Sequence, residues 1–200
     1  MKAVGWWIVV GAVALGVAAS SVAAEMLASV PADAGRSGAA PTPGFPVLEI
    51  WKIDRRMQLR QGETVLREFR VSLGVEPRSG KEVQGDKRTP VGRYYITHKN
   101  GGSRFHRFLG LSYPNEEDAD RGYRRGLISA GEWADIFLAN LHGDDPPYST
   151  RLGGRVGIHG FGGRPYVPVD WTDGCIAISD GEIEYLFDVV AVGTPVIIHE

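Results

Sequence analysis

The sequence predicts a mainly β domain with a few peripheral helices. Glycine and proline are frequent, with 27 Gly and 12 Pro in 200 residues, which favours many turns and short strands over a helical bundle. Short segments with strand-like composition recur along the chain, whereas only two segments begin with a strong helix signal. Strands and helices do not alternate regularly, so a Rossmann-like parallel sheet is not expected.

The first strands are expected to form an antiparallel meander, with turns at residues 54–56 and 61–63. After the second turn, Phe69, Val71 and Leu73 alternate with polar residues, which is the pattern of a half-buried strand. Further strands are expected from composition and turn signals. Apart from the alternating segment, the expected strands cover residues 47–53, 57–60, 91–97, 153–160 and 195–199.

Two helices have clear start signals. Ser129 with Glu132, and Ser179 with Glu182, have the spacing of a capping box, in which the two side chains satisfy free backbone amides. The second signal is followed by apolar residues at helical spacing, namely Ile183, Leu186, Phe187 and Val190. A third helix, short and polar, is expected at residues 116–125.

The N-terminal segment predicts export. Met1 and Lys2 precede an apolar stretch, and small residues follow, so residues 1–24 resemble a secretory signal peptide with cleavage after Ala24. The alternative is an uncleaved anchor, with residues 3–24 as a membrane tether. Either way the remainder is expected in the periplasm or cell envelope. Residues 25–46 are rich in Ala, Pro and Gly and are expected to be a flexible linker before one folded domain at residues 47–200.

Charge and histidine spacing narrow the function classes. The chain has 22 Lys+Arg and 24 Asp+Glu, a net charge of -2, so a nucleic-acid partner is not expected. The histidines other than His159 have no metal-ligand spacing, and neither a metal nor another cofactor is expected. We expect a monomer.

The chain has one cysteine, Cys175, which therefore cannot form an internal disulfide. In an exported protein, such a thiol is either a buried bystander or a reactive group. A nucleophilic thiol needs a base, and His159 lies sixteen positions earlier, far enough for the chain to loop back beside it. Gly174 permits a tight turn and offers its backbone amide to an oxyanion. The spacing alone leaves catalysis and simple core packing both open.

Several motifs together resemble the L,D-transpeptidases with a YkuD-type catalytic domain. The resemblance covers residues 47–200, and its motifs occur in the family's order. They are residues 85–96 (Gly-Asp-Lys-Arg-Thr-Pro-Val-Gly-Arg-Tyr-Tyr-Ile), His159-Gly160, and residues 172–176 (Thr-Asp-Gly-Cys-Ile), while residues 111–115 (Leu-Ser-Tyr-Pro-Asn) fit a subgroup. The segment Asp-Trp-Thr-Asp-Gly-Cys-Ile-Ala is similar to a recognised variant of the cysteine motif.

The resemblance implies a β-sandwich-like domain that acts on peptidoglycan stem peptides, as donor and as acceptor. Cys175 would attack the bond between a diamino acid and D-Ala, form a thioester, and transfer the acyl group to an acceptor amine. His159 would act as base and then as acid, oriented by the carbonyl of Gly160. This chemistry requires the imidazole within hydrogen-bonding range of the sulfur, in a groove open to solvent. With water as acceptor, the protein would be a carboxypeptidase or an amidase that releases wall-anchored protein. A silent wall-binding module is the third alternative.

Two positions depart from the family pattern, because many relatives have a His where this chain has Asp173 and an Arg where it has Ala177. A carboxylate beside the thiol would raise its pKa unless a cation offsets it. We expect Arg164 to supply that cation or to bind the donor's carboxylate. Tyr113 is expected either in the cleft or as a buried aromatic. The expected substrate-binding residues are Trp171, Thr172, Asp173, Arg164 and Tyr113.

Overall fold

The computed structural model describes residues 44–200. The predicted leader and nearly all of the predicted linker lie outside this range, and their boundaries stay predictions. Within residues 44–200, none of the helices combines the length and the apolar character needed to cross a bilayer.

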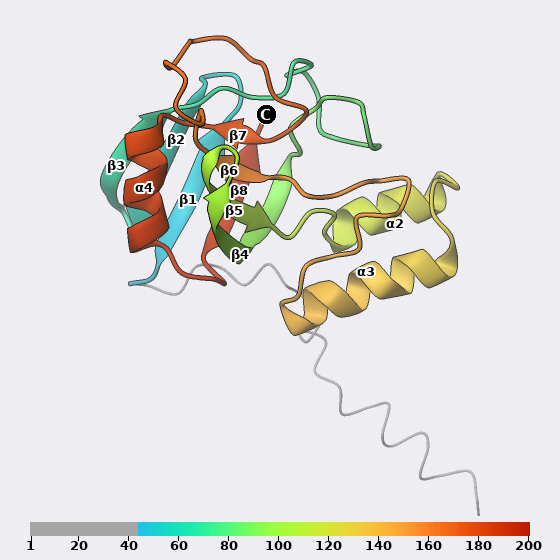
Figure 1. Cartoon of the computed structure of the whole chain (residues 1–200). Coiled ribbons are helices and arrows are strands. Elements are labelled where there is room, and N and C mark those ends of the chain that lie inside the picture. The colour runs from blue at the N-terminus through green and yellow to red at the C-terminus, as the bar shows by residue number, and fades with distance from the viewer. Residues whose placement is uncertain (1–43) are drawn as a thin grey trace, which may run out of the picture. The chain divides into compact units, whose positions relative to one another are not determined.

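The described chain forms a single mixed sheet of eight strands in the order β3-β2-β1-β8-β4-β5-β6-β7 (Figure 1). Neighbouring strands are antiparallel, except that β1 pairs with β8 and β6 pairs with β7 in parallel. The strands are β1 (Pro46–Trp51), β2 (Arg56–Gln61), β3 (Thr64–Arg70), β4 (Gly92–Ser103), β5 (His106–Leu111), β6 (Gly157–His159), β7 (Ile176–Ala177) and β8 (Pro195–His199).

The sheet curls into a half-barrel because β4 bends and the chain after β3 returns to β7. The first residues of β4 pair with β8, and its later residues pair with β5 across register shifts. Ser72 and Ala177 then exchange two backbone hydrogen bonds of 2.8 Å, and Gly74 bridges to Thr172. These bridges tie the segment that leads into β7 to the segment that follows β3.

Three helices accompany the sheet in the described part of the chain: α2 (Glu116–Arg124), α3 (Ala130–His142) and α4 (Asp180–Val189). The predicted capping boxes at Ser129 and Ser179 are both present, and the predicted short polar helix corresponds to α2. A capping box between Asn115 and Asp118, which the sequence analysis did not identify, begins α2.

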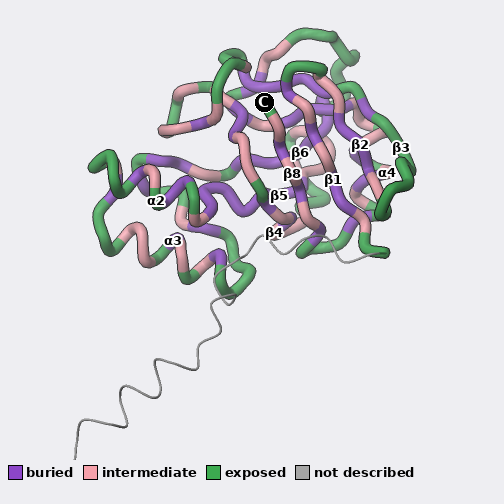
Figure 2. The backbone as a smooth tube through the Cα atoms, turned by 180° about the vertical axis from the view of Figure 1, so that it is seen from behind, coloured by how far each residue is buried: buried purple, intermediate pink, exposed green. Residues whose placement is uncertain are grey.

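The main hydrophobic core lies inside the curl of the sheet. Ile183 and Leu186 of α4, with Val190 directly after the helix, share this core with fully buried strand residues such as Leu48 and Ile158. A smaller cluster joins α2 and α3 through Ala119, Ile128, Ile136 and Leu152. Figure 2 shows that the buried backbone is concentrated in the central strands, whereas the outer sides of α2 and α3 are largely exposed. The helical pair therefore extends the domain beside the main core.

The predicted fold class, a mainly β YkuD-type domain with peripheral helices, is confirmed, and β8 has the predicted bounds. The predicted strand at residues 153–160 is reduced to β6, because Gly153 (φ 77°) and Arg155 (φ 56°) keep the chain before it from extending. The prediction missed β5, β7, residues 98–103 of β4 and residues 64–67 of β3. Those β3 residues are all exposed, so they show no alternation of apolar and polar side chains.

Candidate active site

Cys175 and His159 lie on two neighbouring parallel strands. His159 ends β6 and is paired with Ala177 of β7, while Cys175 directly precedes β7. Residues two positions apart point to the same face of a strand, so Cys175 shares a face with Ala177 and therefore with His159. The two side chains are diagonal neighbours on that face, and both line one pocket.

The turn before Cys175 is fixed by Thr172. Its hydroxyl donates to the carbonyl of Cys175 at 2.7 Å and accepts the amide of Gly174 at 3.1 Å. Gly174 has φ 130°, and a Cβ atom there would lie 2.6 Å from the carbonyl oxygen of Arg88. Only glycine fits this position without displacing backbone. Because the Gly174 amide is engaged by Thr172, it is not free to bind an oxyanion in this structure.

His159 is held as a neutral imidazole with one free nitrogen. A carbonyl oxygen can only accept, so Nδ1 carries the proton that it donates to Gly160 O at 2.7 Å. Burial lowers the pKa of His159, and the nearby Arg104 and Arg164 lower it further, against the hydrogen bond to Gly160, which raises it. The unprotonated Nε2 is therefore available as a base near neutral pH.

Aromatic side chains surround this imidazole. Phe105 stacks on it with ring centroids 4.3 Å apart, and Trp171 meets it edge to face at 5.7 Å. Phe108 lies parallel to it at 6.4 Å. These contacts leave His159 only 1% exposed and restrict the rotation of the ring.

The Cys175 thiol is protonated at neutral pH. Burial raises its pKa to about 11, and the carboxylate of Asp173 acts in the same direction, while the backbone of Gly157 and the ammonium of Lys81 act against it. The sulfur donates a weak hydrogen bond to Arg155 O at 3.7 Å. Within residues 44–200, no hydrogen bond joins Sγ directly to His159. The thiol–imidazole contact that the sequence-based chemistry requires is thus not formed in this structure. Catalytic contacts are often longer in the absence of substrate.

The pocket above the thiol measures about 520 Å³. Three exposed arginines line it, namely Arg104, Arg155 and Arg164, together with Asp173 and the aromatic side chains around His159. A second pocket of about 470 Å³ shares Arg104, Phe105, Phe108 and Arg155 with it. The two hollows are therefore neighbours, and the first combines a nucleophile, a base and several cations.

The predicted substrate-binding residues have different surroundings. Trp171, Asp173 and Arg164 line the thiol pocket, and the guanidinium of Arg164 lies 5.1 Å from the ring centroid of Trp171. Thr172 also borders it, but is 4% exposed and its hydroxyl is committed to the turn. Tyr113 is 1% exposed and donates to Leu152 O at 3.2 Å, so it is a buried aromatic that contributes only to the wall of the second pocket.

Two charged residues that the sequence analysis missed support the site. Lys81, rather than Arg164, is the cation that lowers the pKa of the thiol. Asp180, the first residue of α4, accepts the amides of residues 161–163 at 2.6, 3.0 and 2.6 Å and so holds the loop after His159. Nothing in the sequence near Lys81 indicates that it lies beside the turn before Cys175. Nothing near Asp180 indicates that it holds the loop after His159, so no sequence pattern could have identified either residue.

The fold, together with the neighbouring thiol and imidazole, defines the class of protein: a mainly β domain with a candidate Cys–His site for acyl transfer. The family model of the YkuD L,D-transpeptidase catalytic domain matches residues 47–198. The chain belongs to this family, whose members are cysteine-dependent acyltransferases. The narrower motif subgroup stays a prediction. Comparison with curated protein sequences gave no match.

Solved structures show the same fold. The helical cell shape determining protein Pgp2 from Campylobacter jejuni has 22% identity and a TM-score of 0.56, over 78% of this chain and 48% of that one. Its K307A mutant has 21% identity and a TM-score of 0.58, over 80% of this chain and 49% of that one. This chain therefore spans about half the length of those proteins.

Proposed function

We propose that the protein is a peptidoglycan L,D-transpeptidase with Cys175 as nucleophile and His159 as base. The observation that carries the proposal is the placement of a thiol and a neutral imidazole on one face of paired strands, lining one pocket, in a domain of this family. The substrates would be stem peptides of the wall, one as acyl donor and one as acceptor.

Because the Cys175 thiol and the His159 imidazole are both neutral before substrate binds, the attack of the sulfur on the substrate needs a base. Cys175 transfers its proton to Nε2 of His159 as the sulfur attacks the carbonyl between the diamino acid and D-Ala. The imidazolium then protonates the leaving amine of D-Ala, and the donor remains as a thioester. An acceptor amine attacks that thioester, His159 takes a proton from it, and the released thiol recovers a proton. Gly160 O holds the ring throughout, through its 2.7 Å hydrogen bond from Nδ1.

The backbone of the 173–175 turn is suited to stabilise the oxyanion. The Gly174 amide, which the sequence analysis favoured, already donates to Thr172. Across residues 44–200, the amide of Cys175 has no acceptor, so it is the better donor for the developing negative charge.

The charges of the pocket suit an acidic peptide. Stem peptides carry carboxylates, and Arg104, Arg155 and Arg164 are the cations available to bind them in the pocket. We propose that Arg164 serves the donor's carboxylate, because it lies over Trp171 at the pocket and does not lower the thiol's pKa. Such substrates lie outside the cytoplasm, which agrees with the predicted export and with a site of action in the periplasm or cell envelope. By analogy with the cell-shape protein Pgp2, the cross-links would contribute to cell shape.

The test is intact-mass spectrometry of the purified protein with a carbapenem and with a diaminopimelate-containing tetrapeptide. We expect a covalent adduct in the wild type and none in Cys175→Ala. Arg164→Ala is the matched pocket variant, which keeps the thiol and should slow acylation by the tetrapeptide. Cross-linked dimers identify transfer, whereas a free tripeptide identifies hydrolysis. An adduct that persists in Cys175→Ala would refute the proposed nucleophile.

A further inference from the structure

Lys81 is a buried cation that lies beside the turn carrying Cys175. Its side chain is 4% exposed, and a methyl group built on Gly174 would lie 3.8 Å from its Nζ. Because Gly174 directly precedes Cys175, the ammonium lies beside the backbone from which the thiol projects.

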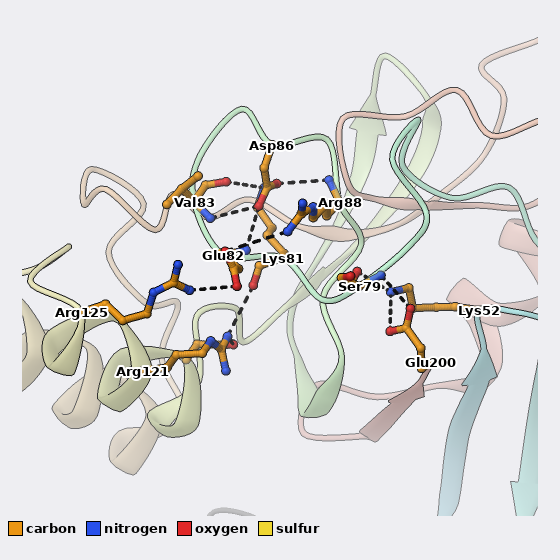
Figure 3. A network of polar contacts seen from close by, with 11 residues as sticks. Lys52, Ser79, Lys81, Glu82, Val83, Asp86, Arg88, Arg121, Arg125 and Glu200 are labelled. Atoms are coloured by element: carbon orange, nitrogen blue, oxygen red, sulfur yellow. Dashed lines mark hydrogen bonds and ion pairs between the residues drawn. The ribbon is translucent and has the colours of Figure 1, made fainter.

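Asp86 fixes the position of this ammonium. Nζ of Lys81 donates to Asp86 at 2.7 Å and to Val83 O at 3.1 Å. Asp86 also accepts the backbone amides of Glu82, Val83 and Arg88 at 2.7, 3.0 and 3.1 Å, and Figure 3 shows these contacts around its carboxylate. Burial acts to raise the pKa of Asp86, but the four hydrogen bonds outweigh it and leave the pKa below its ordinary value. The carboxylate is therefore ionised, and the ammonium stays paired with it.

Helix α2 holds the same loop from outside. Arg125 forms a 2.8 Å ion pair with Glu82, and Arg121 donates to Lys81 O at 3.4 Å. In Figure 3 Arg121 of α2 and Arg125, the C-cap of that helix, both reach toward the loop. The loop that carries Lys81 is thus fixed by α2 on one side and by Asp86 within.

Holding the loop in place does not by itself explain why Lys81 and Asp86 are a charged pair. Burying two ions carries a desolvation cost, and an apolar pair of similar size would pack the loop without it. The turn at Gly174 already has its own support from Thr172. A cation at this position becomes useful when the neighbouring sulfur becomes negative.

Building on the proposed function, we propose that Lys81 is a positioning residue whose ammonium, fixed by Asp86, stabilises the thiolate that Cys175 forms on losing its proton. The other charged or titratable groups near the sulfur act differently. Asp173 opposes the thiolate, and His159 receives the proton. Arg104, Arg155 and Arg164 line the open pocket on the substrate side. Lys81 is the cation behind the turn.

The rate of alkylation by iodoacetamide tests this directly, because Cys175 is the single cysteine of the chain. Between pH 7 and 9 the thiolate is the minor form, so the rate follows its fraction and falls tenfold for each unit by which the pKa rises. In the full-length chain, Lys81→Met should slow alkylation about tenfold, since an adjacent cation lowers a pKa by one unit or more. Asp173→Asn should accelerate it. Lys87→Met, which removes an exposed charge from the same loop, is the matched control and should leave the rate unchanged.

A double variant separates the loss of the cation from the effect of leaving its partner unpaired. Lys81→Met leaves Asp86 buried without its cation, so the double variant Lys81→Met with Asp86→Asn removes both charges and should also be about tenfold slower. If Lys81 only clasps the loop, its loss exposes the thiol and alkylation becomes faster instead. An unchanged or faster rate in the folded double variant would overturn the proposal. Because alkylation needs neither donor nor acceptor, that result would leave the proposed transpeptidase activity to its own test.

Discussion

The hydroxyl of Thr172 offers a sharp test of how the turn presents the thiol. Thr172→Val keeps the shape of the side chain but removes the donor to Cys175 O and the acceptor of the Gly174 amide. Each unsatisfied buried polar group costs about 1–3 kcal/mol, so the two together predict a loss of about 2–6 kcal/mol in the free energy of unfolding. Loosening the turn also displaces the sulfur, and a shift of about 1 Å slows such chemistry roughly 100-fold.

Thr172→Ser is the matched control, because it keeps the hydroxyl and loses only a methyl group, at about 1 kcal/mol. Urea denaturation measures stability, and the rate of carbapenem acylation, followed by mass, measures presentation of the thiol. We expect acylation by the Ser variant to remain near wild type and that of the Val variant to fall. Equal acylation rates in the two variants, or a Val variant within about 0.5 kcal/mol of wild type, would refute this account of the turn.

Two other predictions concern the surroundings of His159. Because burial lowers the pKa of its imidazole, the acid limb of the pH profile of kcat/KM should lie below the ordinary histidine value of about 6.5. Phe105→Ala opens the stacked face of the ring to water and should move that limb to higher pH; an unmoved limb would mean that another group titrates there. Asp180→Ala removes the acceptor of three backbone amides and should cost about 2–3 kcal/mol in urea denaturation, with faster proteolysis after Phe161. Wild-type stability in this variant would show that water replaces the carboxylate.

Features encoded by near neighbours in the sequence were predicted correctly. The capping boxes at Ser129 and Ser179 begin α3 and α4, because each needs only a hydroxyl and a carboxylate three residues apart. The carboxylate of Asp86 accepts three amides from its own loop, which is likewise an arrangement of near neighbours. The fold class followed from the density of turns and from the family motifs.

The pairing that brings His159 and Cys175 together was only partly visible. Their spacing allowed a strand, a loop and a return, and the structure adds that β6 and β7 are parallel with His159 opposite Ala177. The contacts of the sulfur could not be predicted in this way. Its weak hydrogen bond goes to Arg155 O rather than directly to the imidazole. Rotamers and carbonyl directions depend on packing, which spacing does not encode.

The sequence by itself determined the helix starts, the last strand, the single thiol and its candidate base. Each of these features depends only on which residue types lie close together in the chain. Only the tertiary structure decided which charges surround that thiol. Lys81 lies beside Gly174 because the chain after β3 runs next to the segment leading into β7. Arg121 of α2 and its C-cap residue Arg125 bind the same loop. Such contacts join segments far apart in the chain, and they arise from the curl of the sheet, which no local pattern specifies.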